Sequence, residues 1–349
     1  MNIMLNRIRK KIEAELASFA RHIDKAYSLT RISPLLSKSI KDFMLRPGKR
    51  IRPILFVIGY LGFAKKEARG LYTSAIAIEL LHDFMLVHDD IIDKSDLRRG
   101  KPSMHSLLNN HLKKYPDIKF NGQDLSIVVG DCMYAMAIHA FLSINEEKER
   151  KEKALRKFIE AALYTGGGEF IELLASTKEL KKITKREIEN IYDYKTSFYT
   201  FACPLASGAI LAAADKRDVN NLFQIGMYLG RAFQIKDDIL GMLGEEDKIG
   251  KSSLTDLQES KKTLLVWHAY NNVDKKQKAL MESIFSKTKV DRQDLVNMRA
   301  IISDSGGLEF SKNEIFRLFS RACGLLNSSE IKPKFKRLLS SYAENLLRL

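Results

Sequence analysis

The chain has 349 residues, of which 45% are hydrophobic, enough to bury a large core, and it carries 58 Lys and Arg against 43 Asp and Glu. The formal net charge of +15 favours acidic partners, yet no zinc-finger spacing, recognition helix or basic-aromatic motif indicates a nucleic-acid-binding protein. Three widely spaced cysteines argue against a disulfide framework, and no long apolar run indicates a signal sequence or a transmembrane segment. We therefore expect a cytoplasmic protein.

Apolar residues recur at helical spacing along almost the whole chain, whereas alternating strand patterns are scarce. In chain order, the pattern predicts helices over residues 1–31, 35–46, 69–94, 124–144, 151–175, 186–213 and 218–243. More helices are predicted between residues 263 and 349, separated by short polar segments. No stretch rich in Ser, Gly or Pro divides the chain, which predicts one all-helical (all-α) domain over residues 1–349.

Proline and glycine mark the predicted breaks in this pattern. The glycines at 166–168 are expected to interrupt the helix over 151–175, and Pro204 is expected to kink the helix over 186–213. The predicted turns and loops, which are polar or rich in these two residues, lie at 47–53, 98–102 and 250–262.

A predicted helix end carries the acidic motif His88–Asp93, followed closely by Arg98 and Arg99. On a helix, Asp89 and Asp93 lie one turn apart on the same face, so their carboxylates repel unless a cation lies between them. Carboxylate oxygens at this spacing suit Mg²⁺, which prefers one or two carboxylates together with phosphate oxygens. Arginines offer fork-shaped donors for phosphate, so the motif predicts a site for a metal-bound diphosphate.

The helix over 218–243 carries a second acidic pair, Asp237 and Asp238, at its polar end. Either pair taken by itself could be an ordinary charged helix end. A diphosphate that leaves as an anion needs its charge stabilised on both sides. We therefore expect the two pairs to face one polyanion site.

The motifs occur in an order that resembles the trans-prenyl diphosphate synthases, the polyprenyl synthetase family, over residues 45–265. The segments that carry the resemblance are Gly48–Pro53, Glu79–His105, Lys195–Thr196, Phe233–Asp238 and Lys261–Thr263. The resemblance implies an isoprenoid synthase-type fold, a single all-α bundle around a central cavity, and a homodimer. It also implies Mg²⁺-dependent condensation of isopentenyl diphosphate with an allylic diphosphate: dimethylallyl, geranyl or farnesyl diphosphate.

The resemblance also implies roles for individual residues. The residues that would bind Mg²⁺ are Asp89, Asp93 and Asp237, supported by Asp90 and Asp238. The residues that would contact the allylic diphosphate are Arg98, Lys195, Thr196, Gln234, Lys251 and Lys261. The residues that would hold isopentenyl diphosphate are Lys49, Arg52, His82 and Arg99. Ionisation would leave an allylic cation for the double bond of isopentenyl diphosphate to attack, and the released pyrophosphate would accept the proton.

The chain departs from the family's pattern at three places. Gly241 stands where the second acidic motif usually has a third Asp, as in archaeal-type members. The usual Gly-Gln-x-x-Asp element has acids at Glu169 and Glu172, which argues against a metal-water role for Glu172. Ser260 replaces the usual Gly before Lys261, which weakens the assignment of Lys261.

The product chain is expected to grow along the first acidic helix, away from Asp89. Met85 and Phe84 precede Asp89 by four and five residues, about 6–7.5 Å along the axis. In the family that the chain resembles, an aromatic residue at the position of Phe84 forms a floor to the cavity. Phe84, the flexible Met85 and the lack of a two-residue insertion favour the twenty-carbon product, geranylgeranyl diphosphate. Farnesyl diphosphate synthase is the next alternative, and Phe84 could also be an ordinary core residue.

Three other functions fit parts of the pattern. A class I terpene cyclase also uses acidic helices and Mg²⁺, but it needs no second diphosphate site of the kind implied for Lys49, Arg52 and Arg99. A non-catalytic partner subunit would lack the acidic motifs, which are present here. A nucleic-acid-binding protein is suggested by charge alone, and segments such as 148–153 are typical of solvated helix faces.

Overall fold

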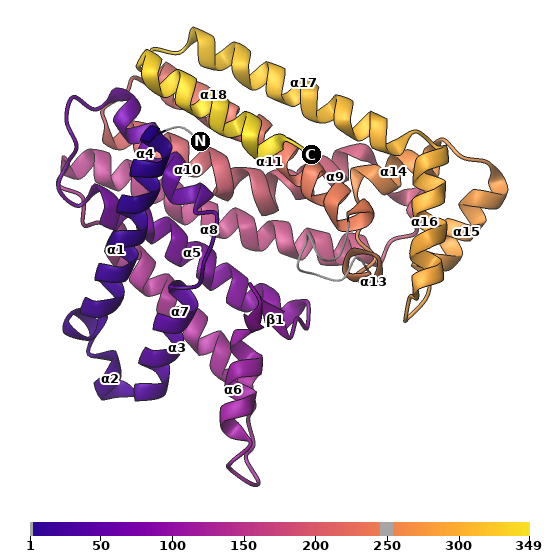
Figure 1. The fold of residues 1–349 in the computed structure, drawn as a ribbon, viewed down its shortest axis with the longest axis horizontal. Helices are drawn as coiled ribbons and strands as arrows, with labels where there is room; N and C mark the ends of the chain where they lie inside the picture. The colour runs from indigo at the N-terminus through magenta and orange to yellow at the C-terminus, as the bar shows by residue number, and fades with distance from the viewer. Residues whose placement is uncertain (1–2, 245–253) are drawn as a thin grey trace. The chain divides into compact units, whose positions relative to one another are not determined.

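The computed structural model describes residues 3–244 and 254–349, and helices make up most of both ranges (Figure 1). The sheet found in these ranges is a hairpin of two short strands, β1 (Leu97–Arg98) and β2 (Lys101–Pro102). The predicted all-α class is therefore confirmed. The helices form two compact units, the first from Met1–Phe158 and Ser207–Ala214, and the second from Ile159–Ala206 and Asp215–Leu349. One domain over residues 1–349 stays a prediction.

The first unit contains the N-terminal helices and the hairpin. In chain order its helices are α1 (Ile3–Tyr27), α2 (Leu29–Ile32), α3 (Pro34–Met44), α4 (Ile51–Phe63), α5 (Leu71–Ile92), α6 (Met104–Leu112), α7 (Gly122–Phe141) and the beginning of α8 (Lys148–Ser176). The end of α10 (Cys203–Leu211) completes this unit.

The second unit begins with the rest of α8 and contains the C-terminal helices. In chain order these are the short 3₁₀ helix η1 (Leu180–Lys182), α9 (Lys185–Ile191), the π-helix η2 (Tyr192–Ala202), α11 (Lys216–Leu243), α13 (Thr255–Gln258), α14 (Leu264–Asn271), α15 (Lys275–Phe285), α16 (Arg292–Asp304), α17 (Gly307–Ser328) and α18 (Pro333–Leu347). Helix α13 lies within the predicted loop at 250–262, of which residues 250–253 are outside the described ranges.

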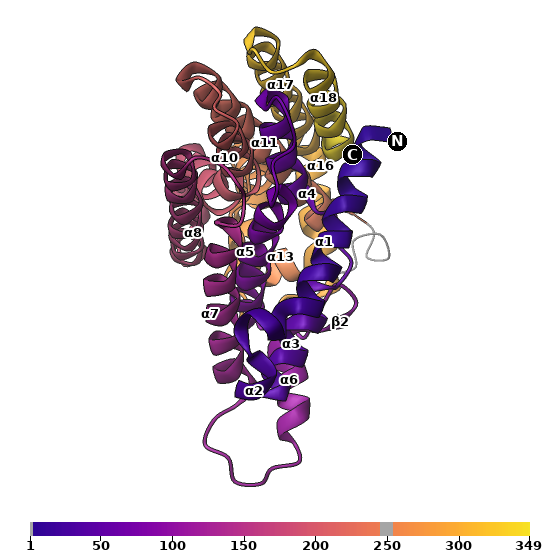
Figure 2. The same cartoon turned by 90° about the vertical axis from the view of Figure 1, so that its left-hand side faces the viewer.

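Helix α5 is surrounded by other helices of the first unit. It packs against α1, α4 and α7, and Figure 2 shows it beside α7. From Ala75 to Leu81, no residue is more than 1% exposed. A helix buried all round needs no polar face, which explains why its sequence is apolar almost without interruption. The polar residues gather near its C-terminal end, so the packing presents the acidic motif at the end of a rigid element.

Helix α11 has the corresponding position in the second unit. It packs against η2, α14 and α17, and Figure 1 shows α17 and α18 running beside it. Near its C-terminal end, Met242 joins a buried cluster with Leu257, Val266 and Met298. The second acidic pair therefore also lies near the end of a helix that is fixed by its neighbours.

The sequence predicts breaks in two helices, at residues 166–168 and at Pro204, and the structure shows what lies at each. The interruption at 166–168 is wrong, because α8 runs unbroken from Lys148 to Ser176. A Cβ at Gly168 would overlap the backbone nitrogen of Lys195, so glycine permits the close approach of η2 to α8. Pro204 is the second residue of α10, directly after the wide turns of η2, where its missing N–H is tolerated.

Helix α7 is the one helix in the described ranges that could cross a membrane by its length and composition. It packs against α5 and α6, and 44% of its most apolar window is buried. A core helix with this burial meets the same criteria, so we interpret α7 as part of the core of the first unit.

Replacing Gly168 with Ala should lower the free energy of unfolding by about 1–3 kcal/mol, because the methyl group would overlap the backbone of Lys195. Gly324→Ala on α17 is the matched control, since a Cβ there meets open space. We expect the control to leave stability unchanged or to raise it by up to about 1 kcal/mol. Denaturant titration of both variants measures the difference, and equal effects would contradict the close packing at Gly168.

Candidate active site

The first acidic motif occupies the last turn of α5. Asp93 caps the helix, and its backbone N–H donates to the carbonyl oxygen of Asp89 at 2.8 Å. The two side chains therefore lie on one face, with a carboxylate oxygen of each within 4.8 Å of the other. Both side chains are partly exposed. Two anionic groups at this separation can share a hard divalent cation, so the donor set fits Mg²⁺.

Asp90 has a different environment from its two neighbours, because its side chain is fully buried. The Arg98 guanidinium donates through Nε to Asp90 Oδ1 at 2.7 Å, and its Nη2 also contacts this oxygen. The same Nη2 lies 3.6 Å from Asp89 Oδ2. Burial raises the pKa of Asp90, and the charge of Arg98 opposes this rise. Arg98 thus neutralises the inner carboxylate while it reaches the edge of the outer one.

The predicted loop at 98–102 is wrong, since these residues belong to the β1–β2 hairpin. Its two turn residues, Arg99 and Gly100, both have left-handed backbone angles, with φ of 55° and 72°. This is the two-residue turn whose twist matches that of paired strands. Gly100 adopts it without strain, and its place beside the two arginines was the available sequence signal. The turn holds Arg98 and Arg99 in fixed directions.

A buried cluster of charges surrounds Arg99. Glu79 and Asp83 lie one turn apart on α5, and neither is more than 1% exposed. Arg50 donates to Glu79 Oε1 at 2.7 Å, and Arg99 Nη2 lies 3.8 Å from that oxygen and 3.7 Å from Asp83 Oδ1. Within the described chain, neither oxygen of Asp83 has a hydrogen-bond partner. Burial and the charge of Glu79 raise the pKa of Asp83.

The remaining residues implied for isopentenyl diphosphate also belong to the first unit. Burial, followed by the charges of Arg52 and Arg99, holds the pKa of His82 well below its usual range. His82 is therefore neutral near pH 7 and can offer one donor and one acceptor. Lys49 is exposed and directly precedes Arg50, whose left-handed φ of 53° starts α4.

The second acidic pair is held by a chain of hydrogen bonds within the second unit. Asp238 is 6% exposed, accepts from Gln234 Nε2 at 2.9 Å, and accepts from the hydroxyl of Tyr192. Thr196 Oγ1 donates to Gln234 Oε1 at 2.7 Å, and Leu264 N–H donates to the Tyr192 hydroxyl at 2.8 Å. Burial raises the pKa of Asp238 to about 8. Thr196, Gln234 and Asp238, named from the sequence, thus form one connected group.

Lys195 binds the two acids that depart from the family's pattern. Its ammonium group lies 2.6 Å from Glu169 Oε2 and also contacts Glu172 Oε2. Because Gly168 lets η2 approach α8 closely, the ammonium group of Lys195 lies in contact with both carboxylates. Glu172 is therefore a partner of Lys195, and the absence of a metal-water role for it stays a prediction.

Lys261 is held by acids that come from its own segment. Its Nζ lies 3.3 Å from Asp256 Oδ1 and 2.7 Å from Glu259 Oε2. Ser260, the replacement for glycine, has the left-handed φ of 54° that glycine adopts readily, so the backbone before Lys261 keeps a glycine-like conformation. Asp237 is partly exposed beside the buried Asp238. Lys251 lies outside the described residues.

Phe84 packs against side chains of its own unit. Its ring is stacked on that of Tyr134 of α7, with centroids 5.1 Å apart, and meets the ring of His88 edge-on at 4.7 Å. Met85, beside it, is partly buried. The aromatic pair makes a rigid group at Phe84, five residues before Asp89, and a cavity floor at this position stays a prediction.

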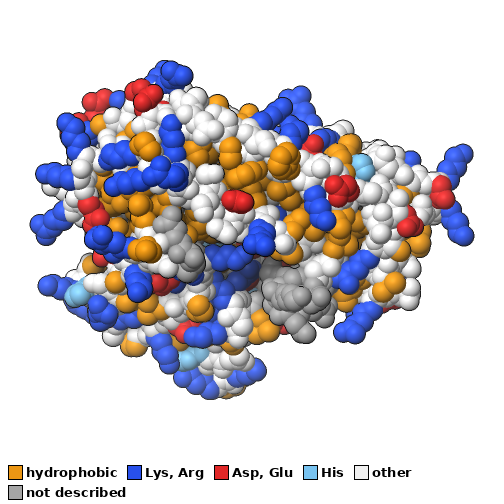
Figure 3. All heavy atoms as spheres, turned by 45° about the horizontal axis from the view of Figure 1, so that its top comes forward, with side chains coloured by type: hydrophobic (Ala, Val, Ile, Leu, Met, Phe, Trp, Pro, Cys, Tyr) orange, Lys and Arg blue, Asp and Glu red, His pale blue; other side chains and the backbone are white. Residues whose placement is uncertain are grey.

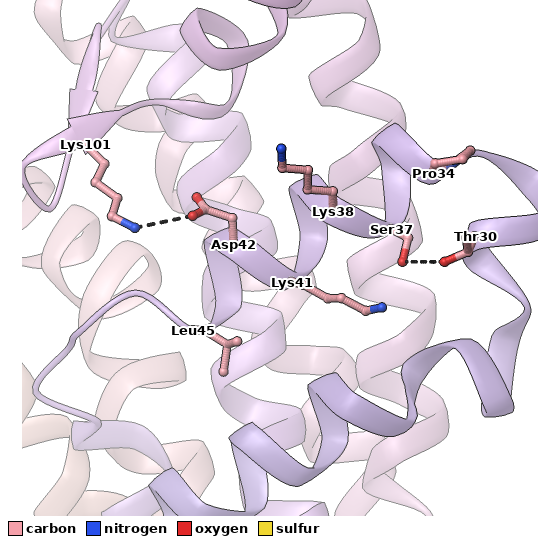
Figure 4. Close-up of a pocket in the computed structure, with 8 residues that line it drawn as sticks. All are labelled: Thr30, Pro34, Ser37, Lys38, Lys41, Asp42, Leu45 and Lys101. Atoms are coloured by element: carbon pink, nitrogen blue, oxygen red, sulfur yellow. Dashed lines mark hydrogen bonds and ion pairs between the residues drawn. The ribbon is translucent and has the colours of Figure 1, made fainter.

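A pocket of about 440 Å³ lies elsewhere on the first unit (Figure 4). Its lining contains none of the residues named from the sequence. Lys101 points toward Asp42 at 3.3 Å, and Lys41 pairs with Asp24, so two of its three lysines are neutralised. Figure 3 shows Lys and Arg side chains scattered over the face in view among apolar ones. Both observations favour solvated charge over a nucleic-acid surface.

Sequence reasoning missed several residues that hold the named ones in place. They are Arg50, Glu79, Asp83, Tyr192 and Asp256. Glu79 and Asp83 had a signal, since two acids at helical spacing interrupt an apolar run that must be buried. Tyr192 had none, because its partners Asp238 and Leu264 are distant in sequence.

A family model described as polyprenyl synthetase matches residues 33–302. The chain is 30% identical over 287 residues to a short chain isoprenyl diphosphate synthase from Methanocaldococcus jannaschii, covering 82% of this chain and 79% of that protein. It is 32% identical over 262 residues to a geranylgeranyl diphosphate synthase from Saccharolobus solfataricus, covering 73% and 72%.

The fold is also similar to that of a solved structure. A geranylgeranyl pyrophosphate synthase from Corynebacterium glutamicum, complexed with isoprenyl diphosphate and magnesium, matches with a TM-score of 0.87. The alignment covers 99% of each chain at 23% identity, so this likeness concerns the fold. The all-helical isoprenoid synthase fold expected from the sequence is thereby confirmed.

Asp83 should make the stability of the protein depend on pH. Because the folded-state pKa is raised, the folded chain binds this proton more tightly, so stability falls as pH rises above the usual aspartate range. Asp83→Asn should remove this dependence on pH. The free energy of unfolding of the variant minus that of the parent should therefore be about 1–3 kcal/mol larger at about pH 9 than at about pH 5. Denaturant titrations across this range measure it. Asp117→Asn, at an exposed site, is the control, and an Asp83→Asn curve parallel to the parent's would contradict the prediction.

Proposed function

Because this chain belongs to the polyprenyl synthetase family and is a short-chain trans-prenyltransferase, we propose that it condenses isopentenyl diphosphate with allylic diphosphates to geranylgeranyl diphosphate. The observation that carries the proposal is the end of α5, where Asp89 and Asp93 share one face beside Arg98 and Arg99. Carboxylates for a metal and arginines for phosphate are the groups that a diphosphate leaving group requires.

Magnesium is part of the proposal, with Asp89 and Asp93 as ligands in the first unit and Asp237 in the second. Mg²⁺ bound to such carboxylates supplies positive charge that stabilises the diphosphate as it leaves carbon. The partly buried partners of the neighbouring acids, Arg98 for Asp90 and Gln234 for Asp238, orient the helix ends from which these ligands project.

We propose that the basic and polar residues form two separate binding sites, one for each diphosphate. In the first unit, Lys49, Arg52 and Arg99 would bind isopentenyl diphosphate, and neutral His82 would add a hydrogen bond. The groups proposed to bind the allylic diphosphate are Arg98, Lys195, Thr196, Gln234, Lys251 and Lys261. A second diphosphate site favours the synthase over a terpene cyclase, which ionises one diphosphate.

Asp89→Ala should lower kcat by about 10³-fold or more, because it removes a metal ligand needed for leaving-group departure. The assay uses purified protein, Mg²⁺, labelled isopentenyl diphosphate and each allylic starter in turn. Asp96→Ala, an exposed acid on the segment after α5, is the control and should keep most of the activity. Full activity of Asp89→Ala would refute the metal assignment, and a parent protein that incorporates no label would refute the synthase itself.

Phe84→Ala should lengthen the product beyond twenty carbons, because it removes the ring stacked on Tyr134 and opens space in line with the growing chain. Chromatographic sizing of the products measures the change. Phe316→Ala, which removes a ring that is 71% exposed on α17, is the control. An unchanged product from Phe84→Ala would show that the floor lies elsewhere, and a fifteen-carbon product from the parent would favour farnesyl diphosphate synthase.

We also propose that the chain forms a homodimer through the second part of α8. Large apolar side chains project from this helix with exposed fractions of 42–70% at Ile159, Leu163, Phe170, Leu173 and Leu174. A row of this size at helical spacing is typical of an interface between subunits. A second copy of the chain would bury it.

Sedimentation velocity should find the parent as a dimer and Leu163→Lys/Phe170→Lys as a monomer, since two charges would be buried at the interface. The control is Phe316→Lys, an exposed aromatic position on another helix, which should remain dimeric. A parent protein that sediments as a monomer at micromolar concentration would refute the interface.

The proposed location is the cytoplasm. Its support is chemical: none of the three cysteines, all within the described ranges, forms a disulfide, as is usual in a reducing compartment. The substrates are charged diphosphates, which do not cross an apolar layer readily. Cell fractionation with an antibody to the chain tests the location, and recovery in a secreted fraction would contradict it.

A further inference from the structure

The carboxylate of Asp256 occupies the space where a side chain at residue 241 would lie. A Cβ built on Gly241 would overlap Asp256 Oδ2 and would stand 3.1 Å from its Cγ. The contact joins two elements of the second unit, since α13 packs against α11. Any larger residue at 241 would therefore displace the carboxylate, so this glycine and this acid depend on each other.

Residue 241 follows Asp237 by four positions, so both lie on one face of α11. In the pattern that the chain resembles, an Asp stands at 241 and its carboxylate would project from this face. We infer that Asp256 supplies that carboxylate from α13 instead, and that it acts as a positioning residue for Lys261. The inference rests on the proposed function, which assigns Lys261 to the allylic diphosphate.

Two contacts connect Asp256 to Lys261. The backbone N–H of Lys261 donates to the carbonyl oxygen of Asp256 at 3.0 Å, and its Nζ donates to Oδ1 at 3.3 Å. The two side chains are only 22% and 23% exposed, so the ion pair is screened less than a surface pair. The backbone contact belongs to the main chain at residue 256, so a substitution of this side chain alters only the ion pair.

The charge of Asp256 also affects the groups around it. Burial by itself would lower the pKa of Lys261, but Asp256, with Glu172 and Glu259, holds it well above its usual range. The same charge adds to the effect of burial in raising the pKa of Asp238. Asp256 is thus one of three acids that favour the protonated form of Lys261, the form that an anionic ligand needs.

The test compares Asp256→Asn and Asp256→Ala with Gly241→Asp/Asp256→Ala, which returns a carboxylate from the other helix. Two measurements are made: KM values for farnesyl and isopentenyl diphosphate, and calorimetric binding of inorganic pyrophosphate without added metal. Asp256→Asn should weaken pyrophosphate binding and raise the allylic KM by about tenfold. The KM for isopentenyl diphosphate should change by less than about twofold. The double variant should recover most of the loss that Asp256→Ala shows.

Asp304→Asn, which removes an exposed acid from α16, is the control for loss of one negative charge. Unchanged pyrophosphate binding and KM in Asp256→Asn would overturn the inference, as would a double variant no better than Asp256→Ala. Asn has the shape of Asp, and thermal unfolding of Asp256→Asn checks that the variant keeps its packing. If Asp256→Asn does not fold, the comparison of the double variant with Asp256→Ala decides. Failure of the proposed function has a separate sign, which is a parent protein that incorporates no isopentenyl diphosphate with any starter.

Discussion

Each acidic motif divides two adjacent carboxylates between the interior and the surface, and the proposed chemistry depends on this division. Asp90 and Asp238 are 0% and 6% exposed, whereas Asp89 and Asp237 are partly exposed. A buried carboxylate is costly unless protein groups hydrogen-bond to it or neutralise it. Arg98 does so in the first unit, and a tyrosine with a glutamine does so in the second. The inner acid anchors the helix end, and the outer acid projects from it in a fixed direction.

The cations near these acids are positioned by the same principle. Arg99 is directed by a turn with left-handed backbone angles toward a buried pair of acids on α5, and Lys195 is held by two acids of α8. A cation fixed by acids loses little conformational freedom when an anion binds, so binding is stronger than for a freely moving lysine. Like charges packed this closely also raise or lower pKa values, which is a common property of functional sites.

The sequence predicted the helices well, because long apolar runs with helical spacing have few alternatives once they are buried. It failed at the glycines of α8 and at the hairpin of residues 98–102. In both places the outcome depends on a close approach or on backbone angles that have no periodic signal. The named site residues came from motif spacing, and the structure shows how Thr196, Gln234 and Asp238 connect. Their supporting residue Tyr192 could not be predicted, because its contacts join distant segments.

The sequence by itself determined the helical class, the two acidic helix ends and the basic residues that follow them, because these properties are local: spacing sets which side chains share a face, and charge sets which ligands suit them. The tertiary structure decided which acid of each pair is buried, where Arg99 points and which side chain fills the space beside Gly241. Those outcomes depend on which segments pack together, since a carboxylate such as Asp256 can take the place of a side chain on another helix only after the chain has folded.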